Sequence, residues 1–125
     1  MSAQTEFPLV FKELKSILKP YASKFKVTAD TADAYSLDGP YSQKWKKEIF
    51  FGAALVKKNY VSFYLMPVYM FPELLKNISP ELRKHMQGKS CFNFKVVDEK
   101  LFEELAKLTE KGVQRFQKAG LLGSS

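Results

Sequence analysis

A β-hairpin pattern in the middle of the chain restricts the possible folds more than any other feature. Residues 48–56 and 60–66 are rich in Phe, Ile, Val and Tyr, and the polar connection Lys57-Lys58-Asn59 separates them. Two such runs joined by a short polar connection are typical of a hairpin, and Asn59 tolerates the left-handed conformation that tight turns use. Pro67 cannot donate to a strand ladder, so we expect the second strand to end there.

Amphipathic helices are predicted on both sides of this hairpin, over about residues 8–21 and 99–119. Apolar residues recur at spacings of three and four in both segments, and Asp98 is the expected N-cap of the second. The predicted stripes are Phe7, Phe11, Leu14, Ile17, Leu18 and Tyr21, and Leu101, Phe102, Leu105, Leu108, Val113 and Phe116. Further strands are predicted over 25–29, 34–38 and 91–96. Short helices are expected near Phe71 and over 80–87, where Ser79 and Pro80 are an N-cap and a first helical residue.

This order of elements predicts one domain over residues 1–125, with an ordered core of about 7–119. The fold class is α+β, because strands in the middle of the chain lie between two long helices. We expect a two-layer sandwich in which both long helices cover one face of a mostly antiparallel sheet.

Strand alternation then assigns residues to the covered and the open face of the sheet, because successive side chains point to opposite sides. The alternation is clear in two predicted strands, residues 60–66 and 91–96. The residues expected under the helices are Val61, Phe63, Leu65, Phe92, Phe94 and Val96. The residues expected on the open face are Tyr60, Ser62, Tyr64, Met66, Cys91, Asn93 and Lys95. This mixture of side chains suits a binding face. The alternative is that loops or a second subunit cover the face. We expect the protein to be a monomer or a weak homodimer.

The charge and the scarcity of reactive side chains limit the function. With 20 Lys+Arg against 13 Asp+Glu, the formal charge is +7, which favours anionic ligands. One Cys and one His exclude an internal disulfide and a multi-His metal site, and they offer few acid–base options. We therefore predict a protein that is not an enzyme, with no resident metal or cofactor. Lacking a signal-peptide pattern or a membrane-length apolar run, it is expected in the cytoplasm and away from membranes.

A basic segment with interleaved aromatic residues favours a second class of partner. Tyr41 and Trp45 alternate with Lys44, Lys46 and Lys47. Backbone charge neutralisation together with base stacking is the chemistry of single-stranded nucleic-acid binding. A nucleic-acid-binding module is therefore an alternative function.

Two stretches, KKNYVSFYLMPVY at residues 57–69 and GKSCFNFK at residues 88–95, resemble the YdhG-like family of small bacterial domains. The resemblance runs from about Tyr35 to Phe116. It implies a frataxin-like α-β-sheet-α sandwich and an intracellular iron chaperone or iron–sulfur assembly accessory protein, with iron as the possible cofactor. Frataxin-like iron binding is associated with acidic residues on the first helix, where this chain has Glu13 among Lys12, Lys15 and Lys19.

We predict that a small anionic ligand or a protein partner binds at the open sheet face and the adjoining 67–71 and 88–90 loops. An apolar-aromatic wall is expected from Tyr64, Met66 and Tyr69. Lys89 or Lys95 would supply positive charge, and Trp45 would line the rim.

Overall fold

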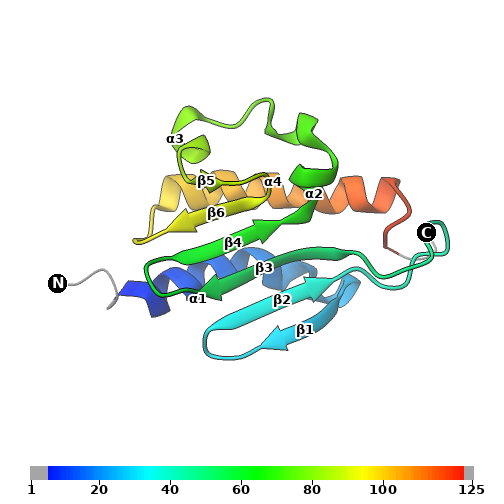
Figure 1. Cartoon of the computed structure of the whole chain (residues 1–125), viewed down its shortest axis with the longest axis horizontal. Helices are drawn as coiled ribbons and strands as arrows, with labels where there is room; N and C mark the ends of the chain where they lie inside the picture. The colour runs from blue at the N-terminus through cyan, green and yellow to red at the C-terminus, as the bar shows by residue number, and fades with distance from the viewer. Residues whose placement is uncertain (1–5, 123–125) are drawn as a thin grey trace.

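The computed structural model describes residues 6–122, in which helices lie against an open sheet of six antiparallel strands (Figure 1). The strand order is β1-β2-β3-β4-β6-β5. The strands are β1 (Lys26–Asp30), β2 (Ala34–Asp38), β3 (Phe50–Val56), β4 (Val61–Leu65), β5 (Met86–Gln87) and β6 (Cys91–Phe94). The helices are α1 (Phe7–Leu18), α2 (Met66–Met70), α3 (Pro80–Arg83) and α4 (Glu99–Lys118), with 3₁₀ helices η2 (Lys19–Lys24) and η3 (Pro72–Leu75). The predicted α+β class is confirmed; the ends of the predicted domain, residues 1–5 and 123–125, lie outside the described residues.

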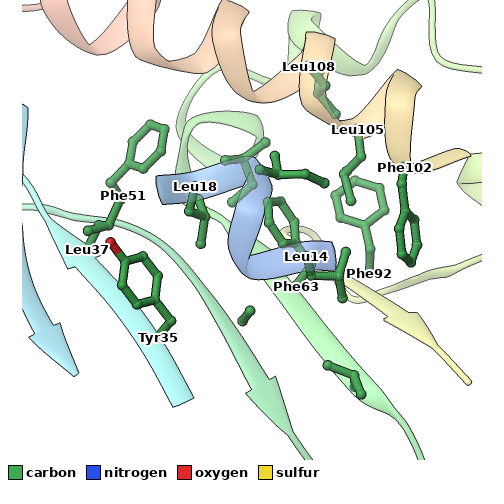
Figure 2. Packing of buried hydrophobic residues seen from close by; sticks show 14 of the residues in the cluster. Leu14, Leu18, Tyr35, Leu37, Phe51, Phe63, Phe92, Phe102, Leu105 and Leu108 are labelled. Carbon is green, nitrogen blue, oxygen red and sulfur yellow. The ribbon is translucent and has the colours of Figure 1, made fainter. Parts of the chain in front are cut away.

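The hydrophobic core lies between the sheet and the helices α1 and α4, which Figure 1 shows behind the sheet. Helix α1 packs on β3 and β4 and also contacts α4. In Figure 2, Leu14 of α1 lies beside Phe63 of β4, and Leu105 of α4 lies near Phe92 of β6. Burying aromatic side chains of this size contributes on the order of 2–3 kcal/mol each, so the covered face supplies much of the stability.

The side chains predicted to face the helices do so in β4 and β6, up to the end of β6. Phe63 is 0% exposed, and Val61, Leu65, Phe92 and Phe94 are also buried. Val96, predicted to face inward, is 48% exposed, so that prediction was wrong. The ladder between β4 and β6 ends at the Val61–Phe94 pair, and beyond it no partner strand maintains the alternation.

The predicted helix over residues 80–87 is shorter than expected. Its start is confirmed, because the Ser79 side chain accepts a hydrogen bond from the Leu82 N–H and Pro80 occupies the first turn. The helix ends at Arg83, and Met86 instead pairs with Phe92 in the edge strand β5. Sheet hydrogen bonds and contact of Met86 with the core compete with continuation of the helix, and they prevail here.

An irregularity in β3 brings one more aromatic ring into the core. The register between β2 and β3 shifts between Leu37 and Asp38, which leaves Phe51 as an extra residue on β3. Its ring stacks on Phe25 at a centroid distance of 4.3 Å and meets Phe116 of α4 edge-on at 5.1 Å. Bulges re-aim side chains in this way, so Phe51 links the sheet to the C-terminal half of α4.

We expect Phe63→Ala and Phe94→Ala each to lower the free energy of unfolding by about 3–5 kcal/mol, because both remove buried rings and leave cavities. Urea titration followed by circular dichroism measures this loss. Lys95→Ala, one residue along and exposed, is the matched control and should change stability by less than about 0.5 kcal/mol. Equal losses in Phe94→Ala and Lys95→Ala would contradict the assignment of faces.

Candidate functional site

A hollow of about 580 Å³ opens between the segment that follows β4 and the turn that joins β5 to β6. Its lining comes from α2, η3, α3, β5 and that turn: Val68, Tyr69, Pro72, Leu75, Arg83, Met86, Gly88 and Lys89. The volume lies in the range of sites that enclose small molecules. The two loops of the predicted site, residues 67–71 and 88–90, thus meet around one hollow.

The wall of the hollow is apolar where it borders the hydrophobic core, and the phenol ring of Tyr69 lies on its solvent side. Pro67 and Val68 of α2 are buried, so the same short helix turns Tyr69 outward, where it is 50% exposed. Leu75 and Met86 are partly buried and pack against the hydrophobic core. A ligand with an apolar or aromatic body would therefore find contacts along α2, η3 and β5.

Two cationic side chains give the hollow a positive charge. The Arg83 Nη2 donates a hydrogen bond to the Leu75 carbonyl at 2.7 Å, which orients the guanidinium with one of its five N–H donors. Lys89 follows Gly88, whose φ of 77° is the left-handed conformation that this turn requires. Within residues 6–122 neither cation forms an ion pair, and no Asp or Glu is among the residues that line the hollow.

The outer wall of the hollow is tied to α4 by polar contacts at two places. Arg115 forms an ion pair with Glu73 at 2.6 Å, and its guanidinium lies 4.4 Å from the ring centroid of Phe71. The backbone N–H and the hydroxyl of Ser79 both donate to the Glu104 carboxylate at 2.7 Å. These contacts hold η3 and the start of α3 at a defined position relative to the sheet.

A third tie is a close apolar contact at the start of α2. A Cβ at Gly112 would lie 2.9 Å from Cγ of Pro67, so only glycine permits this approach of α4 to α2. Glycine inside a helix lowers stability by about 1 kcal/mol relative to alanine. At Gly112 this loss is accompanied by the close packing of α2 on α4 that the missing side chain allows.

The structure brings Tyr69 and Lys89 together and separates them from the other predicted site residues. Met66 was expected on the open face; it is the first residue of α2 and packs against the core, because β4 ends at Leu65 before Pro67. Tyr64 lies on β4 directly opposite Cys91 and is not among the residues that line the hollow.

The open face around Tyr64 carries a network of hydrogen bonds. The Ser62 hydroxyl donates to Oδ1 of Asn93 at 2.7 Å, and the Asn93 amide donates to the side chain of Gln87. Ser62, expected to be open to solvent, is 1% exposed because of this packing. Burial, and then the neighbouring Cys91 thiol, raise the pKa of Tyr64 above its ordinary value.

Lys95 and Trp45 lie in other environments. Lys95 lines a separate hollow of about 370 Å³ together with Tyr60, His85 and Asn93. The Trp45 indole donates from Nε1 to the Ala119 carbonyl at 2.9 Å, next to the end of α4.

Arg83 and Met86 were not among the predicted site residues. The pattern placed both inside a helix over residues 80–87, which gave no sign that they would line the same hollow. The sequence feature that could have indicated the edge strand is the short spacing between the Ser79 cap and Gly88. This spacing is long enough for a brief helix followed by a short strand.

The described residues contain no cluster of three or more His, Cys, Asp or Glu side chains that would bind a metal ion. Of the two acids nearest the β1–β2 turn, Asp30 forms an ion pair with Lys15 at 2.9 Å and Asp33 accepts a hydrogen bond from Thr31 at 3.0 Å.

Comparisons of the chain with known protein families, with curated proteins and with solved structures found no match. The resemblance to the YdhG-like family therefore stays a prediction. Among residues 6–122, every helix is too short or too polar to cross a membrane.

The close contact at Pro67 predicts an unusual effect of alanine at Gly112. Helix propensity alone would make Gly112→Ala stabilising by about 1 kcal/mol, whereas crowding against the Pro67 ring costs about 1–3 kcal/mol. We expect a net loss of stability in urea titrations. In a Pro67→Ala background, which removes the Cγ at 2.9 Å but keeps the Cβ at 3.1 Å, Gly112→Ala should cost less stability than in the unchanged protein. The same loss in both backgrounds would contradict this account of the contact.

Proposed function

We propose that this protein is a non-enzymatic binding protein for a small anion with an apolar or aromatic body. The observation that supports the proposal is the hollow in which Arg83 and Lys89 lie beside apolar walls with no carboxylate among the described lining residues. A carboxylate or a phosphate group would face the two cations, and charge-assisted hydrogen bonds of this kind are about twice as strong as neutral ones.

Binding specificity would come from the combination of charge and shape. The apolar surface of Pro72, Leu75 and Met86 would cover the body of the ligand, and the Tyr69 ring would lie along its exposed side. Arg83 is held by its hydrogen bond to Leu75, so little conformational entropy is lost when it meets the anion. Lys89 is exposed on its turn and supplies a second, more mobile charge.

The finer points of fold and family are also proposals. The packing of α1 and α4 behind an antiparallel sheet supports a frataxin-like α-β-sheet-α sandwich, and the stretches at residues 57–69 and 88–95 support membership of the YdhG-like family. The single cysteine supports a reducing, cytoplasmic setting.

Phenyl phosphate and benzylamine test the proposed site, because they share a ring and differ in the sign of the charge. We expect phenyl phosphate, followed by amide chemical shifts in NMR, to shift the resonances of Tyr69, Gly88 and Lys89. Benzylamine should leave them unchanged, since the hollow is cationic. Equal binding of both compounds would contradict the proposal.

A matched pair of variants locates the interaction. Lys89→Met and Lys84→Met each remove one exposed lysine charge, but only Lys89 lines the hollow. We expect the dissociation constant for phenyl phosphate to rise about tenfold in Lys89→Met, as for the loss of one hydrogen bond to a charged group, and by less than about twofold in Lys84→Met. Equal losses would mean that only the net charge of the protein attracts the ligand.

A further inference from the structure

A tight loop at residues 41–47 is held in one conformation by its own hydrogen bonds. Ser42 and Lys47 form an isolated antiparallel bridge, and the Ser42 N–H donates to the Lys47 carbonyl at 3.0 Å. The Lys46 N–H donates back to the Ser42 carbonyl at 2.7 Å, and the Trp45 N–H donates to the Ser42 hydroxyl at 3.2 Å. Lys46 has a φ of 57°, a left-handed conformation that a non-glycine residue keeps only where its surroundings support it.

The loop is also fixed to the C-terminal end of α4. The buried Ser42 hydroxyl donates to the Gly120 carbonyl, and the Trp45 indole N–H donates to the Ala119 carbonyl at 2.9 Å. The Lys44 stem lies against Gly120, where an added Cβ would be 3.2 Å from its Cδ. The side chains at the tip of the loop therefore extend from a base that is hydrogen-bonded to the end of α4.

What this loop presents to solvent is a set of cations beside aromatic rings. Tyr41 is 52% exposed and Trp45 is 40% exposed, and Lys44, Lys46 and Lys47 are all exposed. None of these three lysines forms an ion pair in the part of the chain that the structure describes. The nearest acid along the chain, Glu48, is already paired with Lys26 at 3.4 Å.

We propose that this basic loop, residues 41–47, is a binding surface for single-stranded nucleic acid. The lysines would neutralise successive phosphates, and an unpaired base would stack on the exposed ring of Trp45 or Tyr41. This inference does not rest on the proposed function, because no residue of the loop lines the hollow that contains Arg83 and Lys89.

The surroundings of Trp45 favour a nucleic acid over a membrane surface. Its indole N–H is bonded to the Ala119 carbonyl and more than half of the side chain is covered, so it is not free to insert among lipids. A partly exposed ring whose N–H is already bonded within the protein is suited to stacking, which every base can provide.

The test uses the full chain and the emission of Trp45, the one tryptophan of the sequence. A twelve-residue oligothymidylate should quench this emission, and an abasic strand with the same number of phosphates should leave it unchanged. Anisotropy of the labelled oligonucleotide, measured at several salt concentrations, gives the affinity. We expect the triple variant Lys44→Gln, Lys46→Gln, Lys47→Gln to bind at least tenfold more weakly, with a salt slope smaller by about 2.

A control with the same net charge separates the loop from the general basicity of the protein. Lys12→Gln, Lys76→Gln, Lys100→Gln removes three exposed lysines elsewhere and should change the affinity by less than about threefold. Trp45→Leu, which keeps the loop lysines, should weaken binding on the order of tenfold.

Three results would overturn the proposal. Equal weakening by the two triple variants would show that binding depends only on net charge. Equal quenching by the abasic strand would show that no base stacks on Trp45. Binding to vesicles of anionic phospholipid with a blue shift of the Trp45 emission, and no quenching by oligothymidylate, would assign the loop to a membrane surface instead.

Discussion

The close approach of α4 to α2 at Gly112 and Pro67 is the constraint on which the hollow depends. It brings Pro67 and Val68 against the core, and the next residue, Tyr69, must then face outward. The polar ties from Arg115 and Glu104 hold the remainder of the wall. Because all of these contacts come from one helix, the position of α4 on the core sets the geometry of the hollow.

The net charge of +7 comes from cationic side chains that differ in whether they form ion pairs and in where they lie on the protein. The ion pairs found in residues 6–122 involve Lys15, Lys26 and Arg115, all in positions that join elements of the fold. The cations of the hollow and of the loop at residues 41–47 have no such partners within those bounds. An excess of positive charge around two separate surfaces would raise the rate at which anions reach both of them.

The sequence predicted the facing of side chains correctly within the regular strands, where residues alternate between the two faces. It predicted the facing wrongly just beyond the strand ends, where the alternation stops. The hairpin and the inward faces of β4 and β6 follow from alternation, which is a property of the extended backbone itself. Val96 and Met66 lie just beyond strand ends, where no ladder imposes alternation, and both depart from the predicted faces. Of the predicted site residues, Tyr69 and Lys89 line the same hollow, whereas Tyr64 lies elsewhere on the sheet.

The sequence by itself determined the two long helices, the central hairpin, the helix cap at Ser79 and the buried faces of the central strands, because these depend on interactions between residues a few positions apart. Only the tertiary structure decided that the helix begun at Pro80 ends at Arg83, since Met86 gains a strand partner in Phe92. It also decided which loops meet, because the hollow requires Tyr69 and Lys89, 20 positions apart, to be held together by the common packing of their elements on the sheet and α4.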